Sequence, residues 1–572
     1  MLPSKNRRDF IKLSALGLGT AVLSAGLFGC NDQLSDDITF SHGVASGDPL
    51  KDRVILWTRA LPGGNSGKIR IGWEVALDPA FVKVVNSGTL ETSEERDFTI
   101  KIDAAGLLPG TSYYYRFLAK NNKSPVGKTK TLVDDSAEKV KLAVVSCSNY
   151  PAGRFHVYQE IAKRSDIDAV VHLGDYTYEY QRGGYASADA GALGREVLPE
   201  TEILTLSDYR TRFAQYRTDV DLQSLHQNHP FIAIWDDHEV ANNSWREGAD
   251  NHQPEEGSFD ERKLNALKAY SEWMPIRPVS PGNDSMIYRS FKFGRLITLH
   301  MLDTRLIGRD QPLNYKDYFS AAGFDTIKFQ QDTTESSRSL LGDAQRKWLQ
   351  SGLSDSDSLW HVLGQQVVMG RMYLPGALAT QQISLPDFSR LVTIATLAAQ
   401  GVEQGPEDLA FLAAKQHLLS FPQLPYNLDA WDGFEAERQN LLKIARDSGT
   451  NLVVLAGDSH NAWANDLVDL NNQACGVEFA TTSVTSPGLE VVLSIPPEAV
   501  IPTEQQLLSL VHDLRYVNIN ERGFLLVSFT ATESEAEYIF VDSVKDSQYQ
   551  VLTQRSKTLK VKLGEHRISP SI

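Results

Sequence analysis

Four runs of apolar, largely β-branched residues are each followed by a side chain that can bind a metal ion. The runs are LAVV, AVVHL, FIAIW and NLVVLA, and shortly after them stand Cys147, Asp175, Asp237 and Asp458. Continuous apolar runs of this length are typical of parallel strands buried on both faces. In an open α/β sheet, ligands lie beyond the carboxyl ends of the strands. The pattern therefore predicts a shared site of the kind found in multi-metal hydrolases.

The N-terminal part of the chain has the pattern of strands and turns. Residues 38–135 contain the strand-like segments DRVILWTRA, KIRIGWEVA, DFTIKID and TSYYYRFLA, with turn signals at Pro62 and Pro109. The stretch 106–116, GLLPGTSYYYR, is similar to the tyrosine-containing corner of fibronectin type III-like sandwiches. We therefore expect an all-β sandwich over residues 38–135.

Strands alternate with helical patterns over residues 141–550. Helical periodicity is present in RFHVYQEIAKRSDI, KLNALKAYSEWM, LGDAQRKWLQSGL and FEAERQNLLKIARDSG. Such alternation predicts a layered α/β domain, in which the strands after the GDSH segment complete a second sheet. The less regular segments 306–340 and 372–430 are expected to be insertions on the side of the active site. Residues 551–572 are expected to form a C-terminal tail.

Residues 1–30 have the features of an export signal. Arg7 and Arg8 precede the Gly- and Ala-rich apolar stretch LSALGLGTAVLSAGLFG, as in twin-arginine signal peptides. This predicts recognition by the Tat translocation machinery and a periplasmic or extracellular mature protein. The segment that ends in Cys30 is similar to a lipoprotein processing box, although Phe28 is atypical there. Membrane attachment by lipid on Cys30 therefore stays an open alternative.

The composition and net charge limit the classes of protein to which this sequence can belong. The 572 residues are 42% hydrophobic and 22% charged, which indicates a globular protein with two or more domains. The formal net charge of −16 argues against a nucleic-acid-binding surface, which needs a basic stripe. An anionic substrate must then be held by local positive charge, such as metal ions, single arginines or helix N-termini.

The strand ends at Cys147 and Asp175 suggest which metals fit. A carboxylate can bridge two cations, so Asp175 is well placed at the centre of such a site. A phenol with a pKa near 10 is deprotonated only by a strong Lewis acid, so Tyr178 as a ligand would indicate ferric iron. A Cys147 thiolate would favour a transition metal. Tyr176, Tyr178 and Tyr180 also fit the simpler interpretation of an aromatic stripe on a strand.

The other two strand ends add oxygen and nitrogen ligands. WDDHEVANN supplies Asp236 and Asp237, and either carboxylate suits calcium or magnesium. Asn242 could ligate a cation or donate a hydrogen bond to a phosphate oxygen. In GDSH, Asp458 and His460 are two residues apart, so both side chains can point the same way from an extended end. A solvated acidic turn and a structural histidine are the simpler alternatives.

These motifs resemble, in order, those of the PhoD-type alkaline phosphatases, a family of the calcineurin-like metallophosphoesterases. The matching segments are GVASGDPLKDRVILWTR, SCSNYPAG, HLGDYTYEY, WDDHEVANN, LDTR, LGDAQRKWL and GDSH. The resemblance spans nearly the whole mature chain and implies a metallophosphoesterase core of two sheets flanked by helices. The chain departs from many members at Leu306, Ile307 and Gly308, where more polar residues usually follow LDTR.

The resemblance also implies cofactors and residue roles. It implies Fe(III) and Ca²⁺, held by Cys147, Asp175, Tyr178, Asp237, Asp458 and His460. It implies metal-assisted hydrolysis of phosphate mono- and diesters outside the cytoplasm, in the service of phosphate acquisition. His238 or Asn242 is expected to hydrogen-bond the phosphoryl group or the leaving oxygen. Arg305 is expected either to clamp phosphate or to form a structural salt bridge.

Two alternative functions stay open from the sequence. One is a phospholipase D-like or nucleotide-directed diesterase built on the same fold. The other is a surface-binding lipoprotein that has kept the fold without turnover, against which the complete ligand set argues. No serine or threonine nucleophile motif is present, so a phosphoseryl intermediate is not expected.

Overall fold

The computed structural model describes residues 34–64, 67–278, 285–321, 323–354 and 357–570. Within these ranges no helix is long and apolar enough to cross a membrane. The expected export signal, with Arg7, Arg8 and Cys30, lies outside the described residues.

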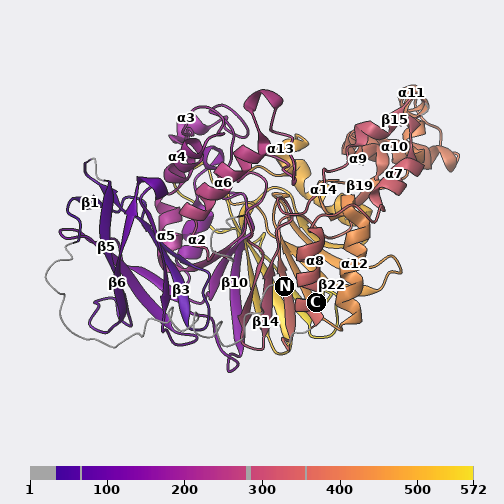
Figure 1. The fold of residues 1–572 in the computed structure, drawn as a ribbon. Helices are drawn as coiled ribbons and strands as arrows, with labels where there is room; N and C mark the ends of the chain where they lie inside the picture. Colours follow the sequence, from indigo (N-terminus) through magenta and orange to yellow (C-terminus); the bar gives the residue numbers. More distant parts are fainter. Residues whose placement is uncertain (1–33, 65–66, 279–284, 322, 355–356, 571–572) are drawn as a thin grey trace, which may run out of the picture.

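Two large sheets form the centre of the molecule (Figure 1). The first has nine strands, in the order β26 (Lys557–Lys562), β25 (Glu533–Val541), β24 (Arg522–Thr530), β10 (Lys139–Val145), β11 (Ala169–His172), β12 (Pro230–Ala233), β2 (Val44–Gly47), β3 (Arg53–Arg59) and β7 (Thr99–Ala105). The second has seven, in the order β13 (Arg289–Phe293), β14 (Ile297–Met301), β17 (Trp360–Gly364), β20 (Leu452–Ala456), β22 (Ala474–Ala480), β21 (Ala462–Val468) and β23 (Leu514–Asn518). Each sheet has a parallel centre, formed by β10, β11 and β12 in the first and by β14, β17, β20 and β22 in the second.

The two sheets pack on each other through one continuous apolar core. Val144 and Phe529 of the first sheet belong to the same buried cluster as Val362 and Val477 of the second. Polar groups at the interface are paired: the indole of Trp360 donates to the carbonyl of Thr530 at 2.9 Å, and the Tyr538 hydroxyl donates to the carbonyl of Trp463 at 2.7 Å. Pairing of such groups avoids the cost of burying an unsatisfied polar atom. The layered α/β fold predicted from the sequence is confirmed.

Helices pack against the sheets and against one another. The first sheet contacts α2 (His156–Ala162) and α5 (Val220–Asn228), which also pack together, while α4 (Leu206–Tyr216) packs on α6 (Phe259–Trp273). The second sheet contacts α12 (Glu435–Asp447), which lies beside α8 (Gly342–Ser354). The four helices predicted by periodicity correspond to α2, α6, α8 and α12, and they are confirmed.

The N-terminal β domain is present, but one of its layers is shared. Strands β5 (Lys68–Ala76), β6 (Val84–Ser93), β8 (Ser112–Leu118) and β9 (Gly127–Lys130) form a separate four-stranded sheet. This sheet packs on β2, β3 and β7 through a common apolar cluster. Strand β2 in turn pairs in parallel with β12, so the second layer of the sandwich continues the nine-stranded sheet. At the predicted tyrosine corner, the backbone N–H of Leu108 donates to the Tyr113 hydroxyl at 2.8 Å.

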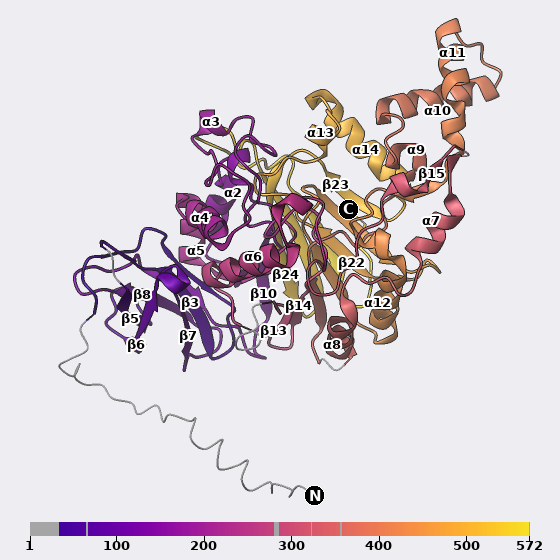
Figure 2. The same ribbon diagram turned by 45° about the horizontal axis from the view of Figure 1, so that its top comes forward.

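The segments 306–340 and 372–430, which show no regular pattern in the sequence, form a lobe that projects from the rest of the molecule (Figure 2). It contains β15 (Phe319–Ser320), β16 (Gly323–Phe324), α7 (Thr326–Thr333), β18 (Tyr373–Pro375), α9 (Gly376–Ala379), α10 (Leu385–Ala399), α11 (Pro406–Lys415) and β19 (Gln423–Pro425). The Tyr315 hydroxyl donates to the carbonyl of Pro425 at 2.6 Å, which joins the two segments. Residues 551–572, expected as a tail, contribute β26, whose Val561 pairs with Ser534 of β25.

Candidate metal centre

The ends of four strands meet at one place, although they come from both sheets. Strands β10, β11 and β12 of the first sheet lead to Cys147, Asp175 and Asp237, and β20 of the second leads to Asp458. Two backbone contacts hold the ends together: Cys147 N–H donates to the carbonyl of Gly174 at 3.2 Å, and Ser146 forms an isolated bridge with Ser483, beyond β22. The convergence predicted from the apolar runs is therefore present.

Three overlapping groups of side chains in the described residues could each hold a metal ion. They are Cys147, Asp175 and His460; Asp175, Asp237 and His238; and Asp236, Asp237 and Asp458. In each group one ligand atom per residue lies within 4.8 Å of the others. Asp175 belongs to two groups, and so does Asp237. Because a carboxylate can bridge two cations, the shared carboxylates would let the three groups hold more than one cation in one continuous site.

Four of these residues have a left-handed backbone. The φ angle is 61° at Cys147, 55° at Asp175, 56° at Asp458 and 61° at His460. This conformation is costly for residues other than glycine, by about 1–3 kcal/mol each, and it clusters at functional sites. The chain therefore turns sharply after three of the strands, and each turn carries a candidate ligand into the common centre.

Buried oxygens without partners show that the centre suits cations. Asp175 Oδ1, Asp236 Oδ2 and Asp237 Oδ1 are buried and have no hydrogen-bond partner. Burial raises the pKa of Asp458 to about 7, and Arg305 lowers it only in part. An unpaired buried carboxylate oxygen is expensive, and a coordinated cation removes that cost. The donor set of thiol, phenol, imidazole and carboxylates fits a transition metal beside a harder cation.

Cys147 and Tyr178 lie on one side of Asp175. Tyr178 is 1% exposed, and its hydroxyl donates to Asp175 Oδ2 at 3.0 Å. Burial, and then the charge of Asp175, raises the pKa values of both the Cys147 thiol and the Tyr178 phenol well above their usual range. Neither group would ionise here without a cation to offset these effects. The alternative of an aromatic stripe does not account for the Asp175 contact.

His460 is held in the form that a metal ligand requires. Its Nδ1 lies 2.8 Å from the carbonyl of Pro487, which can only accept, so Nδ1 carries the proton and Nε2 is left as the free nitrogen. Burial lowers the pKa of His460 to about 4, so the ring is neutral at neutral pH. Nε2 lies 3.4 Å from the Tyr178 hydroxyl, on the same side of the centre as Cys147.

The pKa of His238 is shifted in the opposite direction from that of His460, because carboxylates, including Glu179, lie beside it. Its Nδ1 lies 2.7 Å from Glu179 Oε2, and its ring is 4.2 Å from that of Tyr178. Burial lowers the pKa of His238, but Asp237 and Glu179 outweigh it and raise the pKa well above the usual range. Asn242 is connected to the same carboxylate, since its backbone N–H donates to Glu179 Oε1 at 2.8 Å. Glu179 therefore holds the His238 ring in one orientation at the edge of the centre and favours its protonated form.

Glu239 was one of the charged residues noted in WDDHEVANN, but no role was predicted from the sequence for it or for Glu179. Glu239 accepts hydrogen bonds from the backbone N–H groups of Asp175 at 3.0 Å, Tyr176 at 2.5 Å and Asp236 at 2.7 Å. It thereby fixes the two strand ends that carry Asp175 and Asp236 relative to each other. The sequence does contain one indication of a role: each glutamate is the last residue of an acidic motif, GDYTYE or WDDHE, that follows an apolar run.

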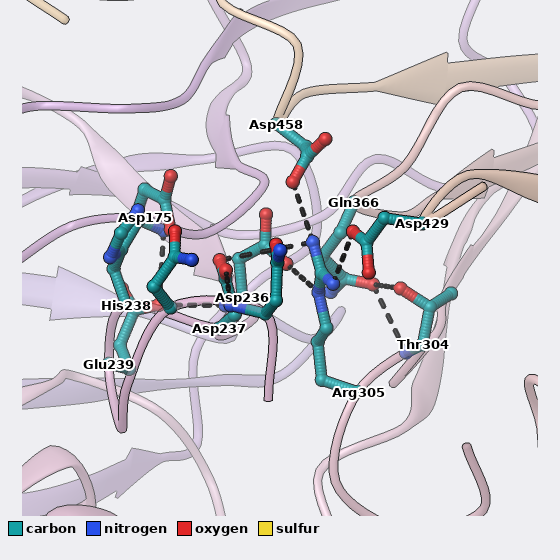
Figure 3. Close-up of polar contacts among 12 residues, drawn as sticks. Asp175, Asp236, Asp237, His238, Glu239, Thr304, Arg305, Gln366, Asp429 and Asp458 are labelled. Atoms are coloured by element: carbon teal, nitrogen blue, oxygen red, sulfur yellow. Dashed lines mark hydrogen bonds and ion pairs between the residues drawn. The ribbon is translucent and has the colours of Figure 1, made fainter. Parts of the chain in front are cut away.

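Arg305 is fully engaged by carboxylates (Figure 3). Its Nε donates to Asp236 at 2.5 Å, Nη1 to Asp429 at 2.6 Å and Nη2 to Asp458 at 2.6 Å. The side chain is 0% exposed. These contacts favour the salt-bridge interpretation over a phosphate clamp, because every guanidinium nitrogen already has an acceptor. Asp236 contacts Arg305 at 2.5 Å and belongs to one metal-binding group, whereas Asp237 lies 3.8 Å from Arg305 and belongs to two.

Comparisons with known proteins identify the family. The PhoD-like phosphatase family model matches residues 142–538, and the model of the PhoD-like phosphatase N-terminal domain matches residues 28–133. Alkaline phosphatase D of Bacillus subtilis (strain 168) is 33% identical over 577 aligned residues, which cover 96% of this chain and 87% of that protein. A solved structure of PhoD superposes with a TM-score of 0.74 at 29% identity and covers 95% of this chain and 93% of its own.

These matches bear on whether the protein is an enzyme or a binding lipoprotein that has kept the fold without turnover. Phosphatase family models match both the N-terminal domain and residues 142–538, and a 33% identical alkaline phosphatase covers 96% of the chain, which supports the enzyme. The chain belongs to the PhoD-like phosphatases and is a phosphoric ester hydrolase of the alkaline phosphatase D type.

Proposed function

We propose that this protein is an exported phosphatase and phosphodiesterase that uses ferric iron and calcium to hydrolyse phosphate mono- and diesters for phosphate acquisition. The observation that carries the proposal is the set of orphaned oxygens on Asp175 and Asp237, placed between a thiol–phenol–imidazole cluster and an all-carboxylate cluster. Thiolate and imidazole donors suit a transition metal, and a phenolate ligand indicates ferric iron, whereas carboxylates suit calcium.

The two clusters, which are linked through Asp175 and Asp237 of the third group, suggest how the ligands divide. Iron would be held by Cys147, Tyr178, His460 and Asp175, and calcium by Asp175, Asp237 and Asp458. When bound, the cations supply Lewis-acid chemistry, which neutralises charge on the phosphoryl oxygens and makes water more acidic at neutral pH.

The chain's own residues supply positioning and proton donation. His238, protonated and oriented by Glu179, is placed to donate a hydrogen bond to a phosphoryl or leaving oxygen. We assign to Arg305 the role of holding the Asp236 and Asp458 carboxylates in place. Asn242 is half-buried beside the same edge, where its amide could contact the phosphoryl group.

Chelation is expected to abolish turnover of mono- and bis-nitrophenyl phosphate, and added calcium to restore most of it. Calcium bound by oxygen ligands exchanges more easily than iron bound by thiolate and phenolate, so a mild chelator removes calcium first. Nitrophenol release before chelation, after it and after calcium addition measures this directly. Full activity in metal-depleted protein would contradict the proposal.

Changing both Arg7 and Arg8 to Lys is expected to keep folded, active enzyme in the cytoplasm. The export machinery reads the guanidinium pair, and an ammonium group lacks its planar fork. Cell fractionation followed by the nitrophenol assay locates the activity, and wild-type protein is the control. Unchanged export of the double variant would remove the targeting claim.

One observation favours a phospholipase-like activity as the second candidate. Pro487, whose carbonyl binds His460, is followed by α13 (Leu489–Val492), in which Val491 and Val492 are 58% and 64% exposed. An apolar rim beside a phosphoryl site suits an ester with acyl chains. Hydrolysis of phosphatidylcholine in mixed micelles, compared with bis-nitrophenyl phosphate, separates the two candidates.

A further inference from the structure

Ser486 lies between two of the proposed iron ligands. It belongs to the segment after β22 and is 0% exposed. Its hydroxyl lies 2.7 Å from the Tyr178 hydroxyl and 3.2 Å from the carbonyl of Cys147. The backbone N–H of Ser486 also donates to the Cys147 carbonyl, at 3.4 Å, and Ser483 Oγ donates to the Ser486 carbonyl at 2.5 Å. The serine is therefore fixed by its own backbone, independently of Tyr178.

Three polar atoms surround the Tyr178 oxygen. They are Asp175 Oδ2 at 3.0 Å, Ser486 Oγ at 2.7 Å and His460 Nε2 at 3.4 Å. An ionised carboxylate only accepts hydrogen bonds. Nε2 of His460 carries no proton, because Nδ1 donates to Pro487. Of the three, only the serine hydroxyl can donate a hydrogen bond to Tyr178 once the phenol has lost its proton.

The serine hydroxyl has two acceptors within reach, the Tyr178 oxygen at 2.7 Å and the carbonyl of Cys147 at 3.2 Å. The oxygen of a metal-bound phenolate is charged and is therefore a stronger acceptor than a neutral carbonyl. Rotation about one bond turns the serine hydroxyl toward it, without any movement of the backbone.

We propose that Ser486 is a positioning residue for the metal centre, which donates a hydrogen bond to the Tyr178 phenolate and so orients this ligand and moderates its donor strength. The inference rests on the proposed iron–tyrosinate centre. Hydrogen bonds to ligand atoms orient metal ligands and tune the metal, and their loss typically lowers metal affinity or activity by about 10- to 100-fold. No covalent or redox step is involved.

The test is the visible spectrum of Ser486→Ala in iron-loaded protein. Removal of the hydrogen bond leaves a more electron-rich phenolate, so the tyrosinate-to-iron charge-transfer band is expected to move to longer wavelength. Iron retention in a competing chelator is expected to fall about tenfold. Ser486→Thr keeps the hydroxyl and is expected to restore the wild-type band.

Thr485→Val is the matched control. Thr485 is 2% exposed and donates to the carbonyl of Asn149 at 2.8 Å, so this variant removes a neighbouring buried hydroxyl that does not reach Tyr178. Its band is expected at the wild-type wavelength. An unshifted band and unchanged iron retention in Ser486→Ala would overturn the role of Ser486. A wild-type protein that binds iron without any such band would instead overturn the iron–tyrosinate assignment itself.

Discussion

Asp175→Asn is expected to lower kcat/KM for bis-nitrophenyl phosphate by on the order of a thousandfold, or about 4 kcal/mol of transition-state stabilisation. Asp175 belongs to two of the three metal-binding groups, and its Oδ1 is buried without a partner. An amide keeps the shape but loses the charge with which Asp175 would hold cations of two groups. The measurement is steady-state kinetics together with the metal content of the purified variant.

Asp466→Asn is the control for this substitution. Asp466, on β21, is also a buried aspartate at 2% exposure, but it pairs with Arg515 of β23, away from the four converging strand ends. Its kinetics are expected to stay near wild type. Equal losses of activity in both variants would show that Asp175 acts through general stability rather than through the metals.

Arg305→Ala is expected to destabilise the protein by about 3–5 kcal/mol, the usual cost of removing one partner from a buried ion pair. The substitution leaves the carboxylates of Asp236, Asp429 and Asp458 without the guanidinium that each of them contacts. Arg305→Lys is expected to recover only part of the loss, because one ammonium group cannot reproduce the three-way fork. Denaturant unfolding of the metal-depleted protein measures the effect.

Arg246 supplies the comparison, since its pairs with Glu247 and Asp310 lie at the surface and its side chain is 46% exposed. Arg246→Ala is expected to cost less than about 1 kcal/mol, as for exposed ion pairs in general. If Arg305→Ala retains wild-type stability but raises KM strongly, the phosphate-clamp interpretation of Arg305 is restored.

The strands and helices of the core were predictable because buried segments have a local apolar or periodic pattern in the sequence. Runs such as FIAIW and NLVVLA became β12 and β20, and the four periodic segments became helices. The pairing of β2 with β12 was not predictable, because strand partners distant in sequence leave no local pattern. Helices α10 and α11 were missed within segments that looked irregular. Ser384, which caps α10, was the signal available for the first of them.

The candidate site likewise contains some residues that local sequence patterns predict and others that only the folded chain brings together. Residues that directly follow an apolar run, such as Asp175 and Asp458, were found because the strand-end rule places them. Ser486 and Asp429 were missed, since neither belongs to a strand-end motif and each reaches the centre only through the folded chain. Glu179 lay inside a recognised motif, but its contact with His238 is a property of the tertiary structure.

The colour and metal content of protein purified after native export test whether a tyrosinate–iron group and calcium form this centre. We expect iron in equimolar amount with the chain, calcium, and a visible band that Tyr178→Phe abolishes. Tyr176→Phe and Tyr180→Phe are expected to keep the band, since the Tyr176 hydroxyl contacts His226 instead. A band that survives Tyr178→Phe, or active protein without iron, would rule out an iron–tyrosinate centre.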